Sequence, residues 1–150
     1  MAYYRQIYMT FWTDSKVSDE FTPEDKYFYL YLLTNSRTNL CGCYEISTKQ
    51  IVIDTGYNSD TVQRLFERLE NVHGVLKHCP ETKEVLLLNW HKYNWNTSQK
   101  QLKGVADECV RIKNPEFRRI VTGYLTEKGY PIENEGYPIS DEKYPMDTTV

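Results

Sequence analysis

The sequence predicts a mainly α-helical protein with a small β-hairpin, arranged as a winged helix-turn-helix followed by two C-terminal helices. Residues 47–72 read as two amphipathic helices joined by a glycine turn. Residues 75–88 form two short apolar segments around a polar turn, which is typical of a hairpin. Residues 98–129 repeat apolar side chains at helical spacing on both sides of an Asn-Pro break.

The N-terminal part predicts an aromatic arm and then a central helix. Residues 3–12 are rich in aromatic side chains and favour a strand or an extended arm. Thr22-Pro23-Glu24-Asp25 is a strong helix start, with a cap, a proline at the first helical position and two acids at the positive dipole end. This helix should run to about residue 35, and its apolar character nearly all round predicts a largely buried position.

A short strand over 44–46 leads into the predicted helix-turn-helix. The first helix covers about 47–55 and ends at Gly56, which can take a positive φ without a Cβ penalty. Asn58 can cap the second helix, over 59–72, through its side-chain oxygen. One face of that helix carries apolar side chains at spacings of three and four, namely Val62, Leu65, Leu69 and Val72.

The remaining elements are a hairpin, a connector and two helices. The hairpin strands are expected at 75–78 and 84–88. An aromatic connector follows, and then a helix over 98–113 whose apolar stripe is Leu102, Val105, Cys109 and Ile112. A last helix begins after Asn114-Pro115 and ends at Gly129.

The chain therefore divides into a winged-helix domain with an N-terminal arm over 1–96, a helical extension over 97–129 and a tail over 130–150. The tail repeats Tyr-Pro every seven residues, beginning at Tyr130, Tyr137 and Tyr144. Its prolines, glycines and negative charge oppose a packed core, so a disordered extended tail is favoured over an array of Tyr-Pro docking motifs.

The motif content argues against an enzyme. The sequence has no glycine-rich phosphate loop and no Gly-x-Ser-x-Gly motif. Its histidines, at 73, 78 and 91, are expected to be solvated or packed. Cysteines at 41, 43, 79 and 109 lack the usual zinc spacing and are expected to be reduced thiols. We therefore predict no catalytic residue, no metal and no cofactor.

Charge and hydropathy limit the partners. The chain has no apolar run near 18 residues and no secretory signal, which predicts no membrane partner. The formal net charge of −3 does not indicate nucleic-acid binding by itself. However, residues 130–150 contribute a charge of −4 and residues 97–129 a charge of +3, so the local charge differs from the net charge of the chain. Local charge, not the total, sets phosphate attraction.

The candidate DNA contacts are polar or basic side chains in the second helix of the helix-turn-helix or on the hairpin: Ser59, Thr61, Gln63, Arg64, Arg68, Lys77 and Lys83. Acids in the same segments oppose this interpretation: Asp60, Glu67, Glu81 and Glu84. The two arginines could instead pair with Glu67, Asp60 or a neighbouring helix, as surface charges commonly do.

Three segments, 11–14, 21–35 and 38–46, resemble the N-terminal region of phage replisome organisers, which are DnaD-like replication initiation proteins. Thr-Asn-Leu-Cys-Gly-Cys-Tyr-Glu-Ile at 38–46 is the most specific of them, and the similarity runs from about residue 3 to about residue 117. The resemblance implies a winged-helix domain that binds double-stranded origin DNA, self-associates, or both. It also implies recruitment of a helicase loader or helicase, in the cytoplasm of a bacterial host cell.

Two alternatives stay open at the level of sequence. One is an oligomerisation or protein-interaction scaffold with the same fold, which would use the aromatic arm at 3–12 or the connector at 90–95. The other is a transcription repressor, because the pattern of the second helix does not separate a repressor from an initiator.

Overall fold

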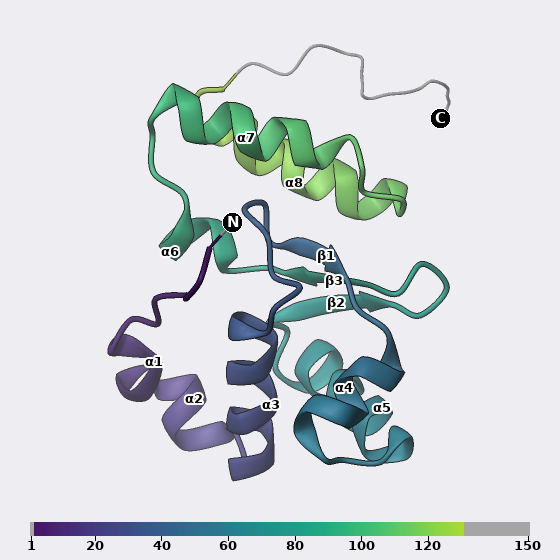
Figure 1. Cartoon of the computed structure of the whole chain (residues 1–150). Helices are drawn as coiled ribbons and strands as arrows, with labels where there is room; N and C mark the ends of the chain where they lie inside the picture. The colour runs from purple at the N-terminus through teal and green to yellow at the C-terminus, as the bar shows by residue number, and fades with distance from the viewer. Residues whose placement is uncertain (1, 131–150) are drawn as a thin grey trace. The chain divides into compact units, whose positions relative to one another are not determined.

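The computed structural model describes residues 2–130, so the predicted Tyr-Pro tail beyond Tyr130 lies outside the described residues. Within that range the chain is mainly helical with a small three-stranded antiparallel sheet (Figure 1). The helical elements are α1 Thr10–Thr13, α2 Ser15–Glu20, α3 Pro23–Thr34, α4 Thr48–Thr55, α5 Ser59–Glu67, the π-helical segment η1 Arg68–Val72, α6 Trp90–Asn94, α7 Gln99–Cys109 and α8 Pro115–Glu127. The strands are β1 Cys43–Glu45, β2 Leu76–Cys79 and β3 Glu84–Leu87.

The described residues form two units. One contains the chain up to Thr38 together with Tyr44–Asn89, and the other contains Asn39–Cys43 together with the chain from Trp90 onward. The second unit therefore includes the loop 39–42, which precedes β1, and Cys43, the first residue of β1. No helix among residues 2–130 has the length and apolarity needed to cross a membrane.

The N-terminal segment differs from the predicted strand or arm. Residues 3–8 have no regular structure, but residues 10–13 form α1 and a second short helix, α2, follows directly. The Asp14 side chain starts α2 by accepting hydrogen bonds from the backbone N–H groups of Lys16 and Val17. Burial of Phe11 and Val17 then holds both short helices.

Helix α3 begins as its sequence predicts. Thr22 and Asp25 form a reciprocal capping box, with Pro23 in the first turn. The helix is less buried than its apolar sequence predicts, however, because Phe28 and Leu32 are fully buried whereas Tyr27 is 48% exposed. Tyr31 is half-buried, and its hydroxyl group donates to Asp54 of α4.

The turn between α4 and α5 also forms as expected. Gly56 has a φ of +84° at the end of α4, and the Asn58 side chain accepts from the N–H of Thr61. Val62, Leu65 and Leu69 are buried, as their spacing predicts. The same prediction is wrong for Val72, which is 60% exposed. The cause is η1, whose wider turns advance the register by less per residue than an α-helix does.

The sheet is built around the predicted hairpin. β2 and β3 pair antiparallel, with Leu76 opposite Leu87 and Cys79 opposite Glu84, and the strand order is β1-β3-β2. Helix α3 contacts α5 and η1, and η1 contacts β2. Figure 1 shows α3, α4 and α5 on the same side of the sheet. The core of this unit lies between these helices and the strands.

The second unit contains α6, α7 and α8, and α7 and α8 pack against each other (Figure 1). The predicted aromatic connector contains a short helix, α6. α7 ends at Cys109, earlier than predicted, although its stripe of Leu102, Val105, Cys109 and Ile112 is buried as expected. Asn114 caps α8 through two backbone N–H groups.

The segment Asn39–Cys43, a loop that ends at the first residue of β1, is bound tightly inside this second unit. The indole N–H groups of Trp90 and Trp95 both donate to the carbonyl of Leu40, at 3.0 and 2.9 Å. The Glu108 carboxylate accepts the backbone N–H of Cys41 at 2.8 Å. A Cβ on Gly42 would lie 2.5 Å from the Trp90 ring, so the close approach requires glycine.

Candidate nucleic-acid interface

Helix α5 carries four of the predicted contacts. Ser59, Gln63 and Arg64 are exposed and Thr61 is half-buried. The Gln63 amide donates to Glu67 at 3.1 Å, so both ends of that pair lie at the surface. The face is therefore mixed in charge, with Arg64 as its cation and Asp60 and Glu67 as its acids.

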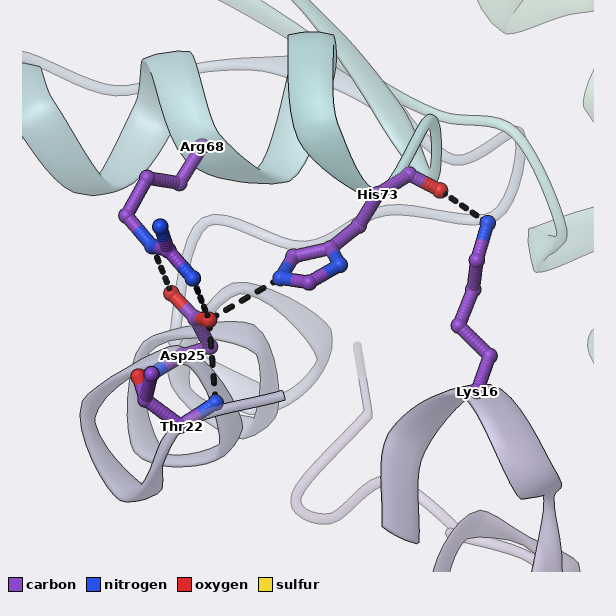
Figure 2. Close-up of polar contacts among 5 residues, drawn as sticks. All are labelled: Lys16, Thr22, Asp25, Arg68 and His73. Atoms are coloured by element: carbon purple, nitrogen blue, oxygen red, sulfur yellow. Dashed lines mark hydrogen bonds and ion pairs between the residues drawn. The ribbon is translucent and has the colours of Figure 1, made fainter. Parts of the chain in front are cut away.

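Arg68 lies one turn after Arg64 but points to α3 (Figure 2). Its Nε donates to Oδ1 of Asp25 at 3.0 Å and its Nη2 donates to Oδ2 at 2.8 Å. This two-bond geometry suits a guanidinium and a carboxylate. Of the alternatives that the sequence leaves open for Arg68, the pairing with a neighbouring helix is the one present in the structure.

Asp25 is buried and is bonded from three directions. Besides Arg68, its Oδ2 accepts the N–H of Thr22 at 3.0 Å and lies 2.9 Å from Nε2 of His73. Burial by itself raises the pKa of Asp25, but the hydrogen bonds from Arg68, His73 and Thr22 outweigh it and hold the pKa well below its usual range. Asp25 is therefore a buried carboxylate with compensating donors.

His73 closes the same cluster, and Figure 2 shows its ring pointing to Asp25. Its ring also lies 4.1 Å, centroid to centroid, from Phe21, and its carbonyl accepts from the Lys16 ammonium. Its Nδ1 is buried and has no hydrogen-bond partner among residues 2–130. This cluster cannot be found from the sequence, because the capping signal at Asp25 does not indicate that Arg68 and His73, far along the chain, bond the same carboxylate.

The hairpin positions the two predicted lysines differently. Lys83 is exposed at the end of the turn and has a φ of +62°, whereas Lys77 is half-buried on β2. The neighbouring acid Glu84 is buried and accepts from the Thr82 hydroxyl at 2.7 Å. Glu84 is therefore withdrawn from the surface where it was expected to oppose DNA.

His78 attaches the hairpin to α5. Its ring stacks on Phe66, with centroids 3.7 Å apart and an interplanar angle of 7°. Its backbone N–H donates to Glu70 of η1 at 3.1 Å. Burial lowers the pKa of His78 to about 4, and the Glu81 carboxylate only partly opposes this effect. The ring therefore packs as a neutral aromatic group at neutral pH.

Three of the four cysteines are buried. Cys41, Cys43 and Cys109 are buried free thiols, and Cys79 is half-buried. Burial raises the pKa of Cys41 well above its usual value and that of Cys109 to about 12. These two thiols are consequently protonated at neutral pH, and the Cys41 thiol donates to the carbonyl of Cys43 at 3.4 Å.

Comparison with known proteins gives no match to a family model, to a curated protein or to a solved structure.

Proposed function

We propose that this chain is a DNA-binding module of winged-helix type that acts in replication initiation. The observation that carries the proposal is the order helix, strand, helix, helix, hairpin over α3, β1, α4, α5, β2 and β3, with the first strand paired to the last. That arrangement leaves α5 available as a recognition helix and the β2–β3 turn as a wing. Ser59, Gln63 and Arg64 face outward from α5, and Lys83 stands at the wing.

The replication role rests on the resemblance of residues 11–14, 21–35 and 38–46 to phage replisome organisers. It implies origin DNA as the duplex partner and a helicase loader or helicase as a protein partner. A footprint of the protein on its own phage or prophage origin supports the initiator. A footprint confined to a promoter instead supports the transcription repressor.

Fluorescence anisotropy with a labelled DNA duplex, measured across salt concentrations, tests the DNA contact. A logarithmic affinity that falls steeply with salt is expected, because lysine and arginine contacts release counterions. Arg64→Ala and Lys83→Ala should each weaken binding and reduce the salt slope by about one. Arg119→Ala, which removes an exposed arginine from α8, is the matched control and should leave binding unchanged. Absence of binding at low salt would contradict the proposal.

A scaffold is the second candidate, favoured by the aromatic arm. Tyr3 is 95% exposed, Met9 is 86% exposed and Trp12 is 57% exposed. Arg5 holds this arm by donating to the side chain and carbonyl of Thr38, both at 2.9 Å. An anchored arm with exposed apolar side chains fits a self-association surface. Light scattering at high micromolar concentration tests it: a monomer excludes the scaffold, and a dimer lost in Tyr3→Ser with Met9→Ser supports it.

A further inference from the structure

The exposed face of α5 offers little net attraction to phosphate. Its charged side chains are Asp60, Arg64 and Glu67, which are two carboxylates and one guanidinium. Arg68, the next cation along the chain, is bonded to Asp25 instead. Phosphate contacts position a protein on DNA, whereas contacts to base edges specify the sequence. A helix with this charge therefore depends on base-edge hydrogen bonds for its contribution to binding.

One amide on this face is held in a defined orientation. Nε2 of Gln63 donates to Oε2 of Glu67, one turn later on the chain, at 3.1 Å, and both side chains are exposed. A carboxylate accepts hydrogen bonds but does not donate them, so the nitrogen of the amide must face Glu67. Since an amide has two N–H donors and a carbonyl acceptor, Gln63 keeps one N–H and its Oε1 for a partner.

These two remaining groups match the major-groove edge of one base. Adenine presents the N7 acceptor beside the N6 amino donor, so it can accept the N–H of Gln63 and donate to Oε1. Guanine presents two acceptors, cytosine a donor, and thymine an acceptor beside a methyl group. Adenine is therefore the base that satisfies both groups at once.

We propose that Gln63 is the residue of α5 that specifies adenine in the major groove of duplex DNA, and that Glu67 is a positioning residue that holds its amide. This role rests on the proposed DNA binding and adds a sequence preference to it. It also gives Glu67, an acid that opposes phosphate contact, a function in recognition. Exposed pairs at this spacing stabilise a helix only weakly, so either side chain can be replaced without unfolding the protein.

Selection from a library of DNA duplexes with a randomised centre tests the assignment on the full chain. The wild type should enrich sequences with a position at which adenine predominates. Gln63→Ala should reduce the preference for adenine at that position by about tenfold and keep the preferences elsewhere. Gln63→Glu should shift the preference to cytosine, whose N4 amino group donates to a carboxylate.

Glu67→Ala separates the positioning role from a direct contact. It should weaken the adenine preference several-fold, yet strengthen binding to the unselected library, because it removes a negative charge. Glu67→Gln should restore the preference, since its carbonyl can accept the same bond. Gln50→Ala is the matched control. Gln50 donates to Asp54 at 2.9 Å with the same spacing on α4, and its loss should leave the base preference unchanged.

The wild-type result separates this assignment from DNA binding itself. Absence of library binding by the wild type overturns both. Salt-dependent library binding without an adenine position, or with an adenine preference that survives Gln63→Ala, overturns the assignment of Gln63 and leaves DNA binding intact. An adenine preference that Glu67→Ala leaves unchanged overturns the positioning role of Glu67. Circular dichroism of each variant checks that the fold is retained.

Discussion

Asp25 shows how one carboxylate joins helix capping to tertiary pairing. It bonds the N–H of Thr22 at the start of α3 and, through Arg68 and His73, both ends of η1. A buried carboxylate without these donors would be strongly unfavourable. The hydrogen bonds of this one side chain therefore explain why α3 packs against the end of the α5–η1 helix.

Asp25→Asn should lower the free energy of unfolding by about 2 kcal/mol at pH 7, because the buried carboxylate loses its charge-assisted hydrogen bonds with Arg68 and His73. Urea denaturation followed by circular dichroism measures the change. Since the pKa of Asp25 lies below its usual value, its stabilisation is complete above about pH 4 and is lost as the pH falls further. The difference between wild type and variant should therefore narrow at pH 3.

The matched control is Asp19→Asn, which neutralises an exposed carboxylate on α2. Its effect should stay below about 0.5 kcal/mol. An Asp25→Asn protein as stable as Asp19→Asn would show that the buried cluster contributes little.

His78 predicts a second pH dependence. The unfolded chain has a histidine pKa of 6.5, whereas the pKa of His78 in the fold is about 4. The unfolded state therefore takes up the proton first, and stability is full above about pH 6.5 and is lost as the pH falls toward 4. The loss is at most about 3 kcal/mol, reduced by the partial exposure of the ring.

His78→Phe keeps an aromatic ring on Phe66 but binds no proton, so its stability should decline less between pH 7 and pH 4.5. Parallel declines in wild type and variant would contradict this assignment.

At the scale of elements, helix ends and the hairpin were the predictable features. Thr22, Gly56 and Asn58 act locally, and their roles at α3, α4 and α5 are confirmed because capping depends on residues within one turn. The π-helical turn could not be predicted in this way. It depends on His73 reaching Asp25, a contact between positions 48 residues apart that helical spacing does not encode.

The candidate DNA contacts also divide into residues whose position the sequence predicts and residues whose position it does not. The exposure of Ser59, Gln63 and Arg64 follows from the apolar face opposite them, so the sequence was sufficient there. Arg68 has the same chemistry as Arg64 and lies one turn away, yet it bonds α3. Tertiary pairing of this kind is not visible in a one-dimensional charge pattern.

Two glycines provide a paired test of backbone conformation. An alanine Cβ would meet nothing within 4 Å at either Gly56 or Gly123. Gly56 has a φ of +84°, so Gly56→Ala should destabilise the protein by about 1 kcal/mol through backbone strain alone. Gly123 lies inside α8, where Gly123→Ala should stabilise by about 0.5–1 kcal/mol. Thermal unfolding of both variants should show melting shifts of opposite sign, and shifts of the same sign would contradict the strain at Gly56.

At the scale of the whole molecule, each of the two units combines stretches of chain that are separated in the sequence. The predicted boundary between residues 96 and 97 would separate Glu108 from the loop whose backbone it bonds. The contacts instead place Asn39–Cys43 in one unit with the chain from Trp90 onward. Nothing in the sequence indicates that Glu108, on α7, bonds the backbone of the loop that contains Gly42.

Glu108→Ala should therefore lower the free energy of unfolding by about 2 kcal/mol, because the N–H groups of Leu40 and Cys41 lose a charged acceptor. Asp107→Ala is the neighbouring control. The Asp107 side chain is 61% exposed and pairs with Lys103 one turn away, so its loss should cost less than about 0.5 kcal/mol. Chemical denaturation compares the two variants, and equal effects would argue against the role of Glu108.

The three tryptophans give each unit its own optical probe. Trp90 and Trp95, 3% and 6% exposed, are fixed on the Leu40 carbonyl, so their fluorescence should be blue-shifted and protected from a dissolved quencher. Trp12, 57% exposed on α1, should emit at longer wavelength and be quenched readily. In a chain carrying Trp12→Phe, the emission would report only on the unit that contains α6, α7 and α8. The order in which the two units unfold can then be observed without an added label.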